Sequence, residues 1–183
     1  MVTIDEIINK YKYYLLHATT IKNLKSILKS GYIKLGNDID VKENQFGNKI
    51  NSIYLSLYSD KLKNIKHTFQ ITLLLSPQLL FEYDITFGKG WGYKYNFIEF
   101  KQTDTITHKY KKIKQIMQYI KTPDLPKTLK GLGIMEHELY VKKKINLNKY
   151  CIGLICYCDE TSKEKIKILL KKSNLNVPLF FEN

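Results

Sequence analysis

The sequence predicts an α+β fold in which strands form the core and a few helices pack around them. Short apolar segments bounded by turn residues recur along the chain, which is typical of buried strands. Segments with a helical period are fewer, and they follow residues that cap helices. With 183 residues, of which 44% are hydrophobic, the chain can bury one sizeable core. We therefore expect a single domain over residues 1–183.

The chain opens with a predicted helix and strand. Thr3-Ile4-Asp5-Glu6 has the spacing of a capping box, which indicates a short lead-in helix over residues 3–11. The apolar run Tyr13-Tyr14-Leu15-Leu16 predicts a buried strand that ends at His17.

A second helix is expected from Ile21 to Lys29. Thr20 is placed to cap its start, and Gly31 to end it. Its apolar positions share one face, and they are Leu24, Ile27 and Leu28.

The rest of the chain alternates strands with loops and two further helices. We expect a polar loop over 34–49, strands over 52–56, 69–75 and 97–100, and a flexible loop over 88–92. An amphipathic helix is predicted over 109–120 and a proline-containing loop from Pro123 to Gly133. Strands over 139–141, 151–157 and 177–181 follow, with a helix capped by Thr161 that runs to Lys171.

Charge and cysteine usage bound the environment. The net charge is +13, carried by lysine alone, because the sequence contains no arginine. Such a surface favours a polyanionic partner, but arginine is the preferred reader of guanine, so sequence-specific DNA recognition is not expected. The N-terminus does not resemble a signal peptide, and no apolar run is long enough for a membrane helix. Cys151, Cys156 and Cys158 suggest reduced thiols in a cytoplasmic protein without a metal site.

Three short constellations carry polar residues on predicted strands. The first is His17-Ala18-Thr19-Thr20, where a histidine ends a strand and hydroxyl side chains follow. The second is Ser52 to Ser59, where alternation places Tyr54, Ser56 and Tyr58 on one side of a strand. Each motif also has a purely structural explanation. The first would be a helix cap preceded by a structural histidine, and the second would be a half-exposed strand face.

The third constellation is the pair Glu136 and Glu138. Alternation places both on one strand face with Tyr140, where two carboxylates repel each other unless a cation or a developing positive charge compensates. Stabilising an oxocarbenium ion during glycosidic cleavage is one such purpose. A solvated edge neutralised by Lys142 and Lys144 is the alternative.

The order of these motifs resembles the ADP-ribosyltransferase superfamily, and within it the His-Tyr-Glu branch of poly(ADP-ribose) polymerase-like enzymes. His17-Ala18-Thr19 is similar to the family's His-Gly-Ser/Thr, and Asn23 to Gly31 to the helix pattern that follows it. Ser52 to Ser56 resembles Gly-Ile-Tyr-Phe-Ala, and His137 to Val141 resembles Asn-Glu-Tyr-Ile-Val. The likeness spans residues 13–157.

This resemblance implies a split two-sheet β core with peripheral helices that binds NAD as a substrate and needs no metal. By analogy His17 bonds a ribose hydroxyl, the Ala18 backbone holds the nicotinamide carboxamide, and Tyr54 lines the nicotinamide. The motif also brings in Thr19, with Ser56 or Ser59 as a carboxamide-bonding serine and Tyr58 as a second stacking residue.

The two glutamates take different roles in the resemblance. Glu138 bonds the 2′-hydroxyl of the nicotinamide ribose and steadies the cationic transition state, and Glu136 helps to activate the acceptor. The chain departs from the family at Ala18, where glycine is usual.

The expected function is mono-ADP-ribosyl transfer from NAD to a protein or nucleic-acid acceptor, with no membrane partner. An alternative is a non-catalytic nucleic-acid or phosphate-binding module, carried by the basic helix start Lys109 to Lys114. An RNA 2′-phosphotransferase is disfavoured, because that relative depends on paired arginines.

Overall fold

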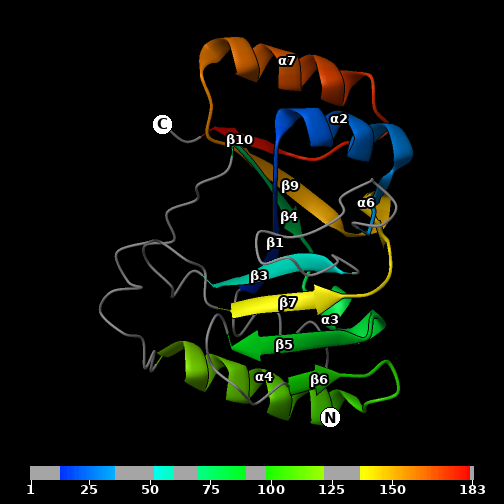
Figure 1. Cartoon of the computed structure of the whole chain (residues 1–183), viewed down its shortest axis with the longest axis vertical. Coiled ribbons are helices and arrows are strands. Elements are labelled where there is room, and N and C mark those ends of the chain that lie inside the picture. The colour runs from blue at the N-terminus through cyan, green and yellow to red at the C-terminus, as the bar shows by residue number, and fades with distance from the viewer. Residues whose placement is uncertain (1–12, 36–51, 60–69, 90–97, 122–136, 182–183) are drawn as a thin grey trace, which may run out of the picture.

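The structure is a computed structural model that describes residues 13–35, 52–59, 70–89, 98–121 and 137–181. An eight-stranded sheet dominates it, joined by a two-stranded sheet and flanked by helices (Figure 1). The large sheet contains β1 (Tyr13–Thr19), β3 (Ile53–Ser59), β4 (Ile71–Leu75), β5 (Ile85–Lys89), β6 (Ile98–Phe100), β7 (His137–Val141), β9 (Cys151–Cys156) and β10 (Leu179–Phe181). The small sheet pairs β2 (Tyr32–Ile33) with β8 (Ile145–Asn146). The helices are α2 (Ile21–Ser30), α3 (Leu79–Glu82), α4 (Ile106–Lys121), α6 (Leu147–Tyr150) and α7 (Glu160–Lys171).

The large sheet divides into two halves that meet at β1 and β3. The strand order is β10-β9-β4-β1-β3-β7-β5-β6, and the pairs are antiparallel except β10 with β9. β1 pairs with β3 from Tyr13↔Ser59 to Leu16↔Ser56. Beyond that point β1 continues along β4 as far as Thr19, and β3 continues along β7 back to Ile53. The sheet therefore forks after Leu16, and the mixed α+β architecture with a split β core is confirmed.

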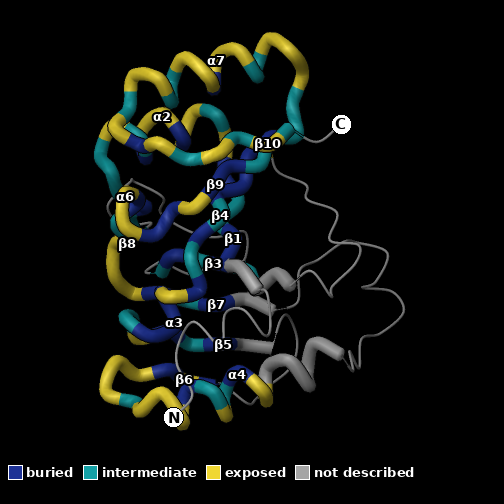
Figure 2. The backbone as a smooth tube through the Cα atoms, turned by 180° about the vertical axis from the view of Figure 1, so that it is seen from behind, coloured by how far each residue is buried: buried dark blue, intermediate teal, exposed yellow. Residues whose placement is uncertain are grey.

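Alternating residues of the central strands form the core. Leu15, Leu55, Leu73 and Leu139 are each 1% exposed or less. Complete burial of such a side chain contributes about 1.5–3 kcal/mol, so this layer fixes the strand faces. α2 and α7 pack together at one end of the molecule, and their outward surfaces are exposed (Figures 1 and 2). α4 lies beside β6 at the opposite end (Figure 1).

The local signals around α2 act as predicted. The Thr20 side chain accepts a hydrogen bond from the backbone N–H of Asn23, 3.2 Å away. Gly31 ends the helix with a φ of 71°, a left-handed conformation that glycine adopts without a Cβ clash. The Gly31 carbonyl then accepts from the Leu147 N–H at 2.8 Å, which ties the chain after α2 to the end of the small sheet.

Several element boundaries differ from the sequence predictions. β1 runs past His17 to Thr19, because its pairing with β4 continues to Ile71. Gly88 and Lys89, expected in a loop, extend β5 through pairing with β7. Asp159, rather than Thr161, caps α7 by accepting from the Ser162 N–H at 2.7 Å.

Some predictions fall outside the described residues. These are the lead-in helix over 3–11, all but the first two residues of the 34–49 loop, residues 90–92, the loop from Pro123 to Gly133, and Glu136. In the described part of the chain, no helix combines the length and apolarity that crossing a membrane requires.

Candidate active site

Three strands bring the three sequence motifs to the fork. Leu16 of β1 pairs with Ser56 of β3, and Ser56 pairs in turn with Glu138 of β7. Glu138 also pairs with Gly88 of β5, so its backbone is held between two strands. The predicted histidine, tyrosine and glutamate segments are therefore neighbours across one sheet, although 121 residues separate His17 from Glu138 in the numbering.

His17 bridges the fork with its ring. Its Nδ1 lies 3.1 Å from the carbonyl oxygen of Tyr54 on β3. Burial lowers the pKa of His17 below its ordinary value, and the hydrogen bond to Tyr54 opposes that shift only in part. The ring is therefore neutral near pH 7. Since a carbonyl can only accept, Nδ1 carries the proton and Nε2 is left as an acceptor.

Tyr54 shares its strand face with a second tyrosine that the sequence motifs did not include as a site residue. Tyr54 pairs with Tyr140 of β7, and their rings meet edge to face with centroids 5.0 Å apart. Both side chains are half-buried, as is Ser56 on the same face. Such an aromatic pair contributes about 0.5–1.5 kcal/mol beyond its buried area, so each ring orients the other. The alternation of Tyr140 with buried Leu139 was the signal that could have identified it.

The residues after His17 have contrasting environments. Thr19 is 5% exposed, and it belongs to the buried side of β1. Ala18 is half-buried and pairs with Thr72 of β4. The Thr72 hydroxyl is completely buried, and the structure shows no hydrogen-bond partner for it among the residues described. An unsatisfied hydroxyl is therefore on the strand position opposite Ala18, where it represents a free-energy cost unless a ligand or rearrangement satisfies it.

The other predicted site residues are placed only in part. Glu138 and Tyr58 are located by their backbone pairing, with Tyr58 opposite Tyr14 on the closed side of the fork. Ser59 pairs with Tyr13 at the far end of the same ladder. Glu136 lies outside the described residues.

The basic start of α4, Lys109 to Lys114, was the alternative candidate for a binding surface, but two of its lysines are engaged in contacts within the protein. Lys109 is 2% exposed, and its Nζ donates to the Phe81 carbonyl at 2.7 Å. Burial lowers the pKa of Lys109 accordingly. Lys112 pairs with Asp104 at 2.5 Å. Lys109 therefore presents no exposed charge to a phosphate, because its side chain packs under α3.

The cysteines do not behave as a reactive cluster. All three are free thiols. Burial raises the pKa of Cys151 to about 11 and that of Cys156 to about 12, so both remain protonated at neutral pH.

The fold is similar to that of DarT from Thermus sp. 2.9. The complex of that protein with NAD+ superposes with a TM-score of 0.59 at 15% identity, covering 92% of this chain and 94% of the other. The complex with ADP-ribosylated ssDNA gives a TM-score of 0.57 at 15% identity, covering 92% and 93%. DarTG from Thermosipho africanus in complex with ADP-ribose gives 0.52 at 13% identity, covering 91% of this chain and 49% of that one. The chain thus has an ADP-ribosyltransferase-like fold.

Sequence comparison adds a viral relative and a family. The chain is 29% identical over 174 residues to "Uncharacterized protein R11" of Acanthamoeba polyphaga mimivirus. That match covers 87% of this chain but 65% of the relative, which is the longer protein. A family model described as a family of unknown function, DUF5846, matches residues 10–123. The protein described here, with its forked sheet and ADP-ribosyltransferase-like fold, therefore belongs to the DUF5846 family.

Proposed function

We propose that this protein is an NAD-dependent ADP-ribosyltransferase of the His-Tyr-Glu branch, and that it transfers a single ADP-ribose to single-stranded DNA. The observation that carries the proposal is the fork itself. There His17 contacts Tyr54 at 3.1 Å, and Glu138 pairs with the adjacent Ser56. The similarity to structures of DarT with NAD+ and with ADP-ribosylated ssDNA supports both the cofactor and the acceptor class.

The residues at the fork fit NAD as a substrate. Tyr54, Ser56 and Tyr140 form one half-exposed face with aromatic rings and a hydroxyl. The unsatisfied Thr72 hydroxyl opposite Ala18 is a polar group of the kind that a carboxamide can satisfy. NAD supplies the bond to be broken, between the nicotinamide nitrogen and C1′ of its ribose.

His17 acts as a hydrogen-bond acceptor for the substrate. Its Nδ1 proton is committed to the Tyr54 carbonyl, so Nε2 accepts from a ribose hydroxyl. This orients the sugar and leaves the imidazole neutral. Tyr54 and Tyr140, fixed against each other, provide aromatic walls for the nicotinamide.

Glu138 supplies the electrostatic part of the reaction. Nicotinamide leaves as a neutral molecule, and positive charge develops on the ribose as the C1′–N bond breaks. A carboxylate at position 138 stabilises that charge and accepts a hydrogen bond from the 2′-hydroxyl. Glu136, two residues earlier, takes the proton from the acceptor as the new bond to C1′ forms. In this scheme the C1′–N bond breaks, the bond from the acceptor to C1′ forms, and the acceptor's proton passes to Glu136.

The alternative is a non-catalytic nucleic-acid or phosphate-binding module on the same scaffold. It predicts polyanion binding without NAD cleavage. Lys109 is buried and Lys112 is paired with Asp104, so the start of α4 has less free positive charge for such binding. NAD turnover therefore separates the two functions.

The first experiment measures nicotinamide release from NAD by the purified protein, with and without a single-stranded oligonucleotide. Labelled NAD then reports ADP-ribose on the DNA. We expect release and transfer by the wild type, and a loss of roughly 100- to 1000-fold for Glu138→Gln, because the substitution removes the stabilising charge. Absence of release, together with absence of NAD binding by calorimetry, would contradict the proposal.

A further inference from the structure

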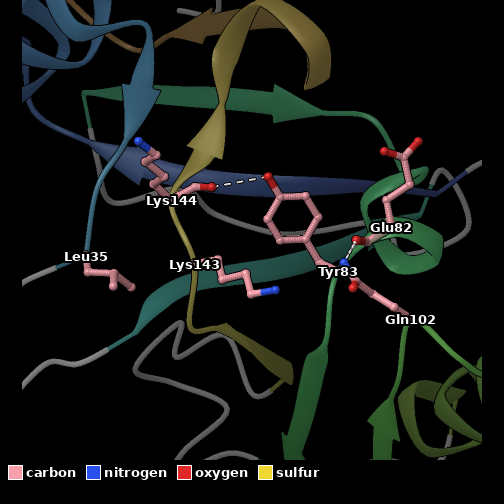
Figure 3. Close-up of a pocket in the computed structure, with 6 residues that line it drawn as sticks. All are labelled: Leu35, Glu82, Tyr83, Gln102, Lys143 and Lys144. Carbon is pink, nitrogen blue, oxygen red and sulfur yellow. Dashed lines mark hydrogen bonds between the residues drawn. The ribbon is translucent and has the colours of Figure 1, made fainter.

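A pocket of about 570 Å³ opens at the end of β7 opposite to Glu138. It is lined by Leu35, Glu82, Tyr83, Gln102, Lys143 and Lys144 (Figure 3). The two lysines belong to the turn between β7 and β8, Leu35 follows β2, and the remaining side chains come from the end of α3 and the segment after β6. Four segments distant in the sequence therefore build it.

The turn that carries the lysines is held in place. The Tyr83 hydroxyl donates to the Lys144 carbonyl at 3.2 Å, and the Lys144 Nζ lies 4.6 Å from the centre of the Tyr32 ring. On the opposite wall, the Gln102 side chain donates to the Glu82 carbonyl. A fixed turn presents its charges with less loss of conformational freedom on binding.

The pocket has an excess of positive charge. Among the described residues that line it, Glu82 is the only acid. Its carboxylate points away toward α6 and accepts hydrogen bonds from Lys149, Tyr150 and Gln78. Burial opposes ionisation of Glu82, but these hydrogen bonds outweigh it and lower its pKa, so the charge is matched by Lys149. Lys143 and Lys144 are exposed, and no ion pair links either to an acid within the described part of the chain.

Figure 3 separates the roles of the two lysines. The Lys143 amine is directed toward Tyr83 and Gln102, whereas the Lys144 amine points the other way. An anion in the pocket would therefore meet Lys143 first, with Lys144 at the rim.

We propose that this pocket binds the backbone of a single-stranded nucleic acid, with Lys143 and Lys144 contacting its phosphates. The inference rests on the proposed function, because it places the acceptor strand along β7. Lys143, the nearer of the two lysines, follows Glu138 by five residues, so it lies no more than about 17 Å from the candidate glutamate along the chain.

The chemistry of the pocket favours a nucleic-acid strand. Its volume suits a nucleotide-sized group rather than a lone phosphate. Lysine binds phosphate as a point charge without reading base edges, so the contact is independent of sequence. The Tyr83 ring and Gln102 amide offer an aromatic surface and a hydrogen-bonding group beside those charges.

The test compares two charge-matched double variants. Lys143→Gln/Lys144→Gln removes the pocket lysines. Lys171→Gln/Lys172→Gln removes two consecutive exposed lysines at the end of α7, the helix that lies at one end of the molecule (Figure 1). The affinity of each for a fluorescent single-stranded oligonucleotide is measured by anisotropy over a range of salt concentrations. Thermal denaturation of both variants checks that they fold.

We expect the pocket variant to bind roughly tenfold more weakly at low salt. Its slope of log affinity against log salt should fall in magnitude by about 0.7 for each lysine that contacts a phosphate. The α7 variant should change neither value appreciably. Equal effects in both variants would show general charge attraction and overturn the proposal, as would wild-type protein that does not bind the oligonucleotide.

Two further arms separate this inference from the proposed function. Nicotinamide release by the wild type without DNA tests NAD chemistry alone. If the pocket variant transferred ADP-ribose to DNA normally and bound the oligonucleotide with unchanged affinity, the pocket proposal would be refuted. The proposed enzymatic function would still stand. Polyglutamate that binds with the same lysine dependence, while DNA does not, would assign the pocket to an acidic protein instead.

Discussion

The two ends of β7 differ in chemistry although one strand joins them. At its start, Glu138 pairs with Ser56 and Gly88 at the fork, beside a neutral histidine and two tyrosines. At its end, the turn with Lys143 and Lys144 lines a positively charged pocket. The groups at the start of β7 can stabilise a positive charge that develops during a reaction. The lysines after its end can bind a permanent negative charge such as a phosphate. We infer that turnover and acceptor affinity are separable on this strand.

The largest expected effect tests that separation directly. Glu138→Gln should lower the rate of NAD cleavage roughly 100- to 1000-fold while oligonucleotide affinity stays within about twofold, because the substitution alters charge only at the fork. Lys143→Gln/Lys144→Gln should appear instead in the KM for the oligonucleotide acceptor. If Glu138→Gln also weakened oligonucleotide binding, turnover and acceptor affinity would not be separable, because the nucleic acid would then bind at the fork.

Stability measurements sharpen the contrast between lysine as a packing residue and lysine as a binding residue. Lys109→Ala should lower the free energy of unfolding by about 2–4 kcal/mol, because it empties a buried position and leaves the Phe81 carbonyl without its donor. Lys111→Ala, two residues further along α4 at an exposed position, should change the free energy of unfolding by no more than about 0.5 kcal/mol. Urea denaturation gives both values, and equal values would mean that Lys109 is not packed as described.

Substitution of His17 should have an intermediate effect confined to the fork. His17→Ala removes the bridge to Tyr54 and the Nε2 acceptor, so we expect kcat/KM for NAD to fall roughly tenfold to hundredfold. His108→Ala, an exposed histidine on α4, is the control and should retain activity. An unaltered kcat/KM in His17→Ala would exclude His17 from the substrate site.

The smallest effect is a pH dependence that originates in His17. Burial holds its pKa below the ordinary value of 6.5, so the folded protein protonates at lower pH than the unfolded chain. The unfolded state binds more protons in that window, and stability therefore falls as the pH drops below about 6.5 toward the folded pKa. NAD cleavage should lose activity over the same range. His108→Ala should show the same loss of activity at low pH as the wild type. If the residual activity of His17→Ala also showed this loss, a group other than His17 would be responsible for it.

Local signals in the sequence were sufficient for most elements. Thr20 and Gly31 bound α2 as predicted, because capping and left-handed glycine depend on neighbours within a few residues. Boundaries that were wrong have a non-local cause. β5 extends to Lys89 only because β7 pairs with it, and β1 passes His17 because β4 does. The predicted cap of α7, Thr161, was also wrong, since Asp159 caps that helix.

The candidate site was predictable as a set of motifs but not as a geometry. The order of His17, Tyr54 and Glu138 indicated their association, and the strands do bring those segments together. The edge-to-face contact of Tyr140 with Tyr54 required the register of β3 with β7. The role of Lys109 required knowledge that α3 would cover it.

The sequence by itself determined the strand faces, the caps of α2, the positive charge and the order of the three motifs, because each is set by residue type and short spacing. The tertiary structure decided where the sheet forks, which nitrogen of His17 is committed to Tyr54, which lysines are buried and which line a pocket. These depend on pairing between segments far apart in the chain, such as Ile53 with Val141, 88 residues later. The entropy lost in closing such long loops makes these contacts a property of the whole fold rather than of any segment.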